Sequence, residues 1–369
     1  RLQSSTMKPS NEKIIVGLSG GVDSSVAALV LLEKGFHVEA LFMKNWDEDD
    51  DDKYCSAAED LLDAQQVADK LGIKLHTVNF SHEYWEDVFE HFLSEHKKGR
   101  TPNPDVLCNQ RIKFKAFLDY AKDLGANKIA TGHYARIINN DGHYLLKAGV
   151  DGSKDQSYFL HLLNQDQLSQ SLFPLGDLHK KQVREIALQN GFENAEKKDS
   201  TGICFIGERP FADFLTTFLP KQKGDIVDEN GHFIKHHHGL PFYTIGQRKG
   251  LEIGGGYSDS PEPWFVADKL VESNEILAVQ GDHPLLYHNT LVADSVHWID
   301  QSPALPHKCS AKIRYRQASQ ECQIMGIDGD CMQVVFTEPQ RAITPGQSIV
   351  FYDRDVCLGG SVIKSKSNE

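Results

Sequence analysis

The chain has 369 residues, of which 40% are apolar and 25% charged, proportions ordinary for a globular protein with room for two or three domains. No apolar run reaches the ~20 residues of a membrane span, and the seven scattered cysteines lack CxxC spacing, which argues against a disulfide framework and a zinc site. The formal charge of −13 counts against a general nucleic-acid binder. We therefore expect a reducing cytoplasm, no membrane partner and no metal site built by the protein alone.

The N-terminal half alternates β-branched apolar runs with amphipathic segments. Strands are predicted at 13–18, 37–43, 74–80 and 128–133. Helices are predicted at 22–35, 56–72, 83–96 and 110–125. Strands that alternate with helices need right-handed crossovers and form a mostly parallel sheet, so we expect an α/β fold. Ligands of such sheets bind beyond the carboxyl ends of the strands, which is where residues 19–23 fall.

The sequence changes character after Pro210. One more helix is expected at 211–220, and short strands and turns follow it. From Leu286 onward strand follows strand, with Gly, Pro and Asp between them, which predicts a small antiparallel β-barrel. These changes divide the chain into three predicted domains, at 7–209, 210–285 and 286–369.

The stretch "SGGVDSS", Ser19 to Ser25, joins the first predicted strand to the first helix. Its two glycines let the backbone approach an anion, and the helix N-terminus points N–H groups at the same place. A Walker loop carries a lysine that reaches the β- and γ-phosphates, and here no lysine follows. The loop therefore suits a departing pyrophosphate, with Asp23 a candidate to help hold Mg²⁺. It resembles the loop of the PP-loop ATP pyrophosphatases, and the alternative is a tight turn with capping serines.

Two segments carry cysteines beside turn residues. In "TPNPDVLCNQRIKF", Thr101 to Phe114, two prolines predict an extended loop that holds Asp105 and Cys108. In "DSTGICFIGERPF", which begins at Asp199, Cys204 follows a glycine turn. Two such cysteines in a nucleotide-binding enzyme suggest a sulfur donor and a resolving thiol, which must approach within about 7 Å between Cα atoms to pair. The alternative for Cys108 is a buried structural cysteine.

Seven motifs then occur in one order: "GLSGGVDSS", "NPDVLCN", "TGHYAR", "DQSYFL", "STGICFIGER", "TIGQRKGL" and "IRYRQ". With them the chain resembles the bacterial tRNA-specific 2-thiouridylases over essentially its whole length. The resemblance implies an N-terminal Rossmann-like PP-loop domain that binds ATP, a central tRNA-binding domain and the C-terminal barrel. It also implies that ATP, with Mg²⁺, adenylates O2 of the wobble uridine (position 34) of tRNA. Sulfur then replaces the adenylate, and AMP and pyrophosphate are released.

The resemblance also assigns residues. Cys204 would carry a persulfide loaded by a sulfur-relay protein, Cys108 would form a transient disulfide with it, and Asp105 would be an acid or base. The residues expected to line the ATP site are Gly17, Leu18, Ser19, Gly20, Gly21, Val22, Asp23, Ser24, Met43 and Gly132. Those expected to contact the target base or the tRNA are Asn103, Pro104, Asp105, His133, Lys154, Asp155, Gln156, Arg314, Tyr315 and Gln347.

A basic segment gives the anticodon loop a place to dock. Lys97 to Lys115 contains six cations and one acid, a local charge of +5. Two other functions stay open: an amide-forming PP-loop synthetase, which leaves the cysteine pair unexplained, and an RNA-binding scaffold with an inactive nucleotide site. The run "DEDDDD" at 47–52 is expected to be a solvated loop, and "HHH" at 236–238 a hairpin loop. The four cysteines after residue 300 are expected in the core: Cys309, Cys322, Cys331 and Cys357.

Overall fold

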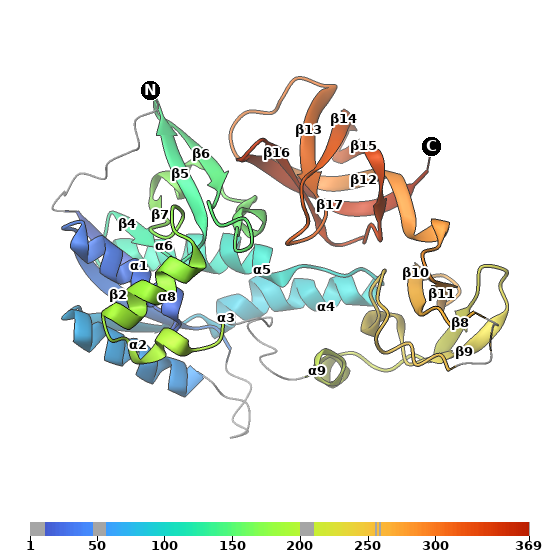
Figure 1. Ribbon diagram of the computed structural model, residues 1–369, viewed down its shortest axis with the longest axis horizontal. Coiled ribbons are helices and arrows are strands. Elements are labelled where there is room, and N and C mark those ends of the chain that lie inside the picture. The colour runs from blue at the N-terminus through green and yellow to red at the C-terminus, as the bar shows by residue number, and fades with distance from the viewer. Residues whose placement is uncertain (1–11, 47–56, 200–209, 255–256, 258–259, 369) are drawn as a thin grey trace.

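The computed structural model describes residues 12–46, 57–199, 210–254, 257 and 260–368. They form three sheets with helices around the first of them. Figure 1 shows the parallel sheet and its helices at one end, a small β-rich part at the other, and a barrel above the long helical segment that connects them. Across these residues, no helix is both long and apolar enough to cross a bilayer.

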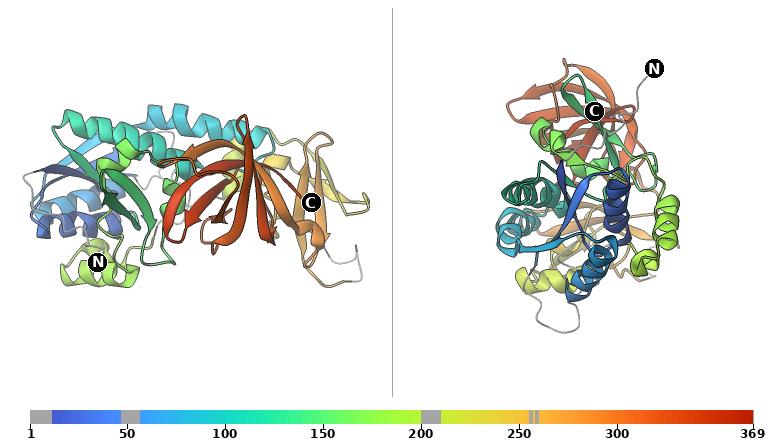
Figure 2. Two further views of the ribbon diagram at one scale, coloured as in Figure 1. Left: turned by 90° about the horizontal axis from the view of Figure 1, so that it is seen from above. Right: turned by 90° about the vertical axis from the view of Figure 1, so that its left-hand side faces the viewer.

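The first sheet is parallel and has the strand order β3-β2-β1-β4-β7. Its strands are β1 (Lys13–Gly17), β2 (His37–Lys44), β3 (Leu75–Asn79), β4 (Lys128–Ala130) and β7 (Ser171–Leu172). On one face, Ile14 and Val16 of β1 pack against α1 (Val22–Glu33), α2 (Ala57–Leu71) and α8 (Lys180–Gln189). Ile15 points to the opposite face, where the remaining helices of this part pack. Helices therefore cover both faces (Figure 2), as the apolar runs of the strands predict.

Two long helical segments lie on that second face. The first joins α3 (Ser81–Tyr84), the π-helical η1 (Trp85–Phe89) and α4 (Glu90–Lys97). The second joins α5 (Pro104–Leu107), the π-helical η2 (Cys108–Ala116) and α6 (Phe117–Asp123).

The second segment corrects the extended loop expected around Asp105 and Cys108, because both residues lie in the helix. The prolines misled the prediction. Pro104 occupies the first turn, where a missing N–H costs nothing, and the Asn103 side chain caps the helix by accepting a hydrogen bond from the Asp105 N–H at 3.2 Å.

The barrel closes through six antiparallel strands, because β12 pairs with both β15 and β17. Its strands are β12 (Tyr287–Trp298), β13 (His307–Lys312), β14 (Gln320–Asp328), β15 (Cys331–Arg341), β16 (Ser348–Asp353) and β17 (Val356–Ser367). The antiparallel barrel predicted from Leu286 onward is thereby confirmed, within the α/β fold class. Of the cysteines expected in its core, Cys322 and Cys357 are buried, whereas Cys309 and Cys331 are half-buried.

A hairpin of the N-terminal half joins the sheet of the barrel. Its strands β5 (Ala135–Asn140) and β6 (His143–Ala148) turn at Asp141 and Gly142, and β6 pairs with β17. The short elements that follow it are η3 (Ser157–Leu160), α7 (Gln165–Ser169) and η4 (Glu193–Glu196). The first predicted domain thus contributes two strands to the sheet of the third, and the three domain boundaries stay predictions.

The central part is a four-stranded sheet in the order β10-β11-β8-β9. It contains α9 (Phe211–Phe218), β8 (Gly224–Val227), β9 (Phe233–His237), η5 (Leu240–Phe242), β10 (Trp264–Leu270), β11 (Glu275–Gln280) and η6 (Pro284–Leu286). The hairpin loop expected at 236–238 is wrong, because His236 and His237 lie in β9. His237 is buried and bridges Asn274 O and the Gly239 N–H, which pins the strand end. The acidic run at 47–52 lies outside the described residues.

Candidate active site

The turn between β1 and α1 is closed by its own serines. The Ser24 hydroxyl accepts a hydrogen bond from the Ser19 N–H at 3.1 Å, and the Ser24 and Ser25 hydroxyls both donate to Gly21 O at 3.0 Å. Gly20 has φ +77°, a conformation that favours glycine. The first turn of α1 therefore presents its backbone N–H groups at the carboxyl end of the sheet, the geometry of an anion site.

Glycines at this turn allow contacts that a larger residue would block. A Cβ on Gly20 would lie 2.4 Å from Asp60 O, and a Cβ on Gly132 would lie 2.9 Å from the backbone of Asp23. At Gly17, a Cβ would lie 3.4 Å from the Met43 side chain. The structure therefore gathers the residues predicted for the ATP site, 17–24 together with Met43 and Gly132, around one strand-to-helix turn.

A lysine distant in sequence stands beside the loop that lacks one. Lys180, the first residue of α8, places its Nζ 2.7 and 2.8 Å from the two carboxylate oxygens of Asp23 and 2.8 Å from Asp199 Oδ1. The Tyr134 hydroxyl donates to Asp23 Oδ1 at 2.7 Å. Sequence reasoning missed Lys180, because it belongs to no motif and only the fold brings it to the loop.

Asp199 is the last described residue before the segment that carries Cys204. It accepts hydrogen bonds from Lys154 at 2.6 Å and Arg184 at 2.8 Å in addition to its contact with Lys180. Partial burial raises the pKa of Asp199, but hydrogen bonds from Lys154 and Lys180 outweigh it and lower the pKa to about 2. Cys204 itself lies outside the described residues, so its pairing with Cys108 stays a prediction.

The second helical segment brings Asp105 and Cys108 to one side of a helix, three residues apart. Burial raises the pKa of Asp105, and the positive charge of Lys113 opposes the shift only in part. Cys108 is 3% exposed and belongs to an apolar cluster that includes Phe114. A carboxyl with a raised pKa beside a sheltered thiol suits proton transfer and thiol chemistry.

Comparison with known families agrees with this geometry. The chain matches a tRNA methyl transferase HUP domain over residues 12–208, a tRNA methyl transferase PRC-barrel domain over 212–280 and an aminomethyltransferase β-barrel domain over 288–363. The tRNA-specific 2-thiouridylase MnmA of Ruthia magnifica is 69% identical to it over 96% of this chain and 98% of that protein. The chain belongs to the tRNA-specific 2-thiouridylase family.

Further members of the 2-thiouridylase family match just as completely. The protein of Aeromonas salmonicida is 57% identical over 96% of this chain and 97% of its own, and that of Pseudomonas aeruginosa PAO1 is 56% identical over 99% and 97%. The solved structure of a 4-thiouridine synthetase with RNA and ATP covers 56% of this chain and 49% of that one, at 18% identity and a TM-score of 0.34. That similarity is too low to support an argument.

Several residues that the 2-thiouridylase resemblance assigns to tRNA contacts are engaged inside the protein. Asp155 is buried, and its carboxylate accepts hydrogen bonds from Gly149, Ser157 and the Lys312 ammonium. The Gln156 side-chain oxygen accepts a hydrogen bond from the Tyr134 N–H, and the Gln156 N–H donates to Tyr134 O. These contacts position the segment that holds Lys154, and direct RNA contacts from Asp155 and Gln156 stay predictions.

His133 is also buried, next to the helical segment that carries Asp105 and Cys108. Its Nδ1 lies 2.7 Å from the Thr131 hydroxyl, and its ring packs against Phe114 and Phe173 with centroids 5.8 Å away. Burial, aided by the charge of Lys113, lowers the pKa of His133 well below its ordinary value. The His133 imidazole is therefore held in its neutral form, next to the helical segment that carries Asp105.

Two contacts tie the barrel to segments next to the helix that carries Asp105 and Cys108. The Gln347 side chain donates to Thr101 O at 2.7 Å, two residues before Asn103. The Tyr315 ring packs on Phe159 with centroids 4.5 Å apart, and Arg314 is exposed beside it. Arg314, Tyr315 and Gln347 therefore lie in loops of the barrel, near the helix that carries Asp105 and Cys108, and the tRNA contacts expected of them stay predictions.

Proposed function

We propose that this member of the 2-thiouridylase family uses ATP to convert the wobble uridine of tRNA to 2-thiouridine, with sulfur carried as a persulfide on Cys204. The names of its relatives support tRNA thiolation as the reaction. The observation that supports the mechanism most is the ammonium of Lys180, which joins Asp23 of the phosphate loop to Asp199. Five peptide units separate Asp199 from Cys204, and they span at most about 18 Å. This chain length supports the proposal that the sulfur carrier can reach the nucleotide site.

The phosphate loop fits the polyphosphate of ATP. Backbone N–H groups at the start of α1 and the ammonium of Lys180 complement negative charge, and Gly132 leaves room that a side chain would fill. Attack by uracil O2 on the α-phosphate forms the O–P bond of an adenylate and expels pyrophosphate toward these donors. The loop needs no lysine of its own, since Lys180 supplies the charge from α8.

Magnesium fits the site only as a companion of the nucleotide. Asp23 offers one carboxylate, which Lys180 and Tyr134 already contact, and MgATP is commonly held by one or two carboxylates together with phosphates and waters. Over the part of the chain that the structure describes, no group of three or more His, Cys, Asp or Glu residues is arranged to hold a metal ion. When bound, Mg²⁺ would neutralise phosphate charge during adenylation.

We assign sulfur transfer to Cys204 and to the helix that carries Asp105 and Cys108. The terminal sulfur of the Cys204 persulfide forms a bond to C2 of the activated uracil, and the bond between C2 and the adenylate oxygen breaks to release AMP. The Cys108 thiolate then attacks the Cys204 sulfur, which forms a disulfide and leaves the thiocarbonyl on the base. Asp105, whose carboxyl has a raised pKa, takes or returns the proton. An external dithiol must reduce the disulfide before the next turnover.

Nucleoside mass spectrometry tests this function. An unmodified tRNA transcript is incubated with the protein, MgATP and a low-molecular-weight persulfide, and position 34 is analysed after digestion. We expect 2-thiouridine that depends on ATP and is lost in both Cys204→Ser and Cys108→Ser, while both variants still bind tRNA. Undiminished thiolation in both variants would refute the sulfur relay, and AMP release without 2-thiouridine would return the amide-forming alternative.

A further inference from the structure

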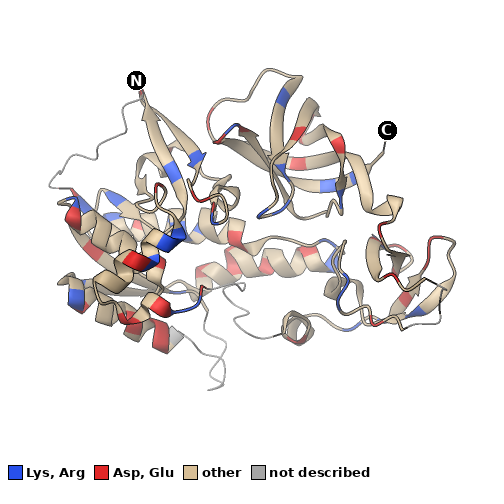
Figure 3. Cartoon of the chain, viewed as in Figure 1, with Lys and Arg blue, Asp and Glu red and all other residues tan. Residues whose placement is uncertain are grey.

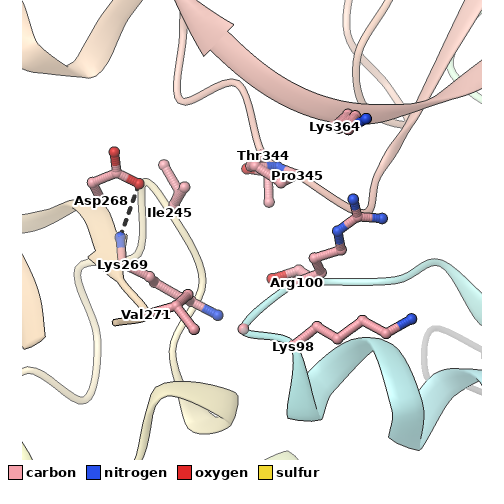
Figure 4. A pocket seen from close by; sticks show the side chains of 11 residues that line it. Lys98, Arg100, Ile245, Asp268, Lys269, Val271, Thr344, Pro345 and Lys364 are labelled. Atoms are coloured by element: carbon pink, nitrogen blue, oxygen red, sulfur yellow. Dashed lines mark hydrogen bonds between the residues drawn. The ribbon is translucent and has the colours of Figure 1, made fainter. Parts of the chain in front are cut away.

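A cavity of about 190 Å³ lies where the three parts of the molecule meet. Its walls come from the end of α4 and the following turn, from β10 of the central sheet, and from the barrel at Thr344, Pro345 and Lys364. At roughly 30 Å³ for each water molecule, it has room for a small polyatomic ion. Figure 4 shows its polar side chains, among which Lys98, Arg100, Lys269 and Lys364 are cationic and Asp268 is the acidic one.

Lys269 is the unusual residue of this cavity. The residue is 9% exposed, and its Nζ is buried without a hydrogen-bond partner among the described residues. In Figure 4 its side chain extends from β10 toward Arg100 and Lys98. Burial lowers the pKa of Lys269 to about 8, although the charge of Asp268 opposes the shift. A buried ammonium is normally paired, so its lack of a partner points to an anion that completes the site.

The other charges leave the cavity positive. Lys98 and Arg100 share the buried carboxylate of Glu95, at 2.9 and 3.1 Å, which orients them and offsets part of their charge. Asp268 lies 3.7 Å from the ammonium of Lys366. No such carboxylate faces Lys269 within salt-bridge distance in the described residues. The C-terminal end of α4 is accordingly rich in Lys and Arg (Figure 3).

The cavity adjoins the turn that leads into the helix carrying Asp105 and Cys108. Thr101 lines it, and the Thr101 N–H donates to Pro345 O at 3.0 Å, while its carbonyl accepts from Gln347 at 2.7 Å. Two residues later Asn103 caps the helix that carries Asp105 and Cys108. An anion bound here would therefore lie close in sequence to Asn103, Pro104 and Asp105, the residues predicted to contact the target base.

We propose that this cavity binds a phosphate group through Lys269, Arg100 and Lys98. Several Lys and Arg donors gathered at one place match the charge and the several oxygens of a phosphate group. The phosphate could belong to the RNA backbone or be free phosphate or pyrophosphate. Only the first of these rests on the proposed function. In either case the ligand joins the α/β part, the central sheet and the barrel through one ion.

Thermal unfolding tests the site without reference to catalysis. Inorganic phosphate, compared with chloride at equal ionic strength, should raise the Tm of the wild-type chain by several degrees and should give the same shift in Lys269→Arg. In Lys269→Met the shift should shrink to what the phosphate loop alone contributes. Methionine removes a buried unpaired charge, so the Tm of Lys269→Met without phosphate should be unchanged or higher. A merely structural lysine would instead lower it. Lys235→Met is the matched control in the same sheet, since Lys235 Nζ is bonded to Glu252 O and should keep the phosphate response.

Filter binding of a tRNA transcript at several salt concentrations identifies the source. If an RNA phosphate occupies the site, Lys269→Met should weaken binding about threefold to tenfold and reduce the salt slope by about 0.7–0.9, the value for one phosphate contact. If the occupant is free phosphate, the wild-type chain should still show a larger Tm shift than Lys269→Met, while the two proteins should have the same salt slope for tRNA binding. Equal phosphate responses in Lys269→Met and the wild-type chain, together with equal tRNA slopes, would overturn the proposal even where thiolation itself is found.

Discussion

Replacing Lys180 with methionine tests the role of the ammonium that Asp23 and Asp199 share. The substitution removes two charged hydrogen bonds from Asp23, at 2.7 and 2.8 Å, and a contact of 2.8 Å from Asp199. Asp199 keeps Lys154 and Arg184, and the Asp23 side chain is 34% exposed, so water replaces part of the loss. We therefore expect the free energy of unfolding to fall by about 2 kcal/mol, below the 3–5 kcal/mol typical of a fully buried pair.

That change corresponds to a Tm lower by roughly 4–8 °C for a domain of this size. Because the ammonium stands beside the phosphate loop, the KM for ATP in a pyrophosphate-release assay should also rise at least tenfold. Lys181→Met is the matched control: the Lys181 side chain is 89% exposed and lies 3.9 Å from Glu185, so its loss should cost less than about 0.5 kcal/mol. Equal effects of the two substitutions, or an unchanged KM in Lys180→Met, would refute the reasoning.

Three further predictions follow from single contacts. Gly132→Ala would place a Cβ 2.9 Å from the Asp23 backbone. It should abolish ATP-dependent turnover, while circular dichroism shows an intact fold. Gly152→Ala is the control, because its Cβ would have nothing within 4 Å, and it should change neither the turnover nor the circular dichroism spectrum. Lys312→Met should lower the free energy of unfolding by about 3 kcal/mol in urea denaturation, because it leaves the buried Asp155 carboxylate without its ammonium, and a loss below ~0.5 kcal/mol would contradict this. Burial lowers the pKa of His161 to about 4. The contribution of its neutral form to stability is therefore complete above pH 6.5 and falls as the pH drops toward 4. Over that range the free energy of unfolding of the wild-type chain should fall by up to about 1.4 kcal/mol per pH unit relative to His161→Gln, and parallel pH profiles of the two proteins would disprove this.

The parallel sheet and the barrel were predictable because their signals are local. The apolar run of β1, the glycines after it and the amphipathic α1 follow one another within twenty-one residues, from Lys13 to Glu33. The hairpin β5–β6 also carries a local signal. Asp141 and Gly142 have φ +50° and +91°, and an Asp-Gly pair is a common hairpin turn. Its pairing with β17, more than 200 residues later, is set by tertiary structure alone.

The candidate site was predicted less completely, for two physical reasons. Pro104 suggested an extended loop, yet a proline at the first helical position starts a helix, and this places Cys108 on a helix face. Lys180 meets Asp23 across 157 residues, so no spacing rule could have connected them. The same holds for Lys269, whose position in the cavity depends on how the three parts pack together. The residues that sequence finds are those in motifs, and the charges that complete them come from the fold.

The claim that uracil O2 is adenylated before sulfur replaces it has one most direct test. A tRNA with ¹⁸O at O2 of uridine 34 is thiolated by the protein with MgATP and a persulfide, and the AMP produced is analysed by mass spectrometry. Adenylation at O2 predicts AMP that carries one ¹⁸O for each 2-thiouridine formed, because the O–P bond formed in the adenylate is retained when the C2–O bond breaks. Formation of 2-thiouridine with unlabelled AMP would contradict the account.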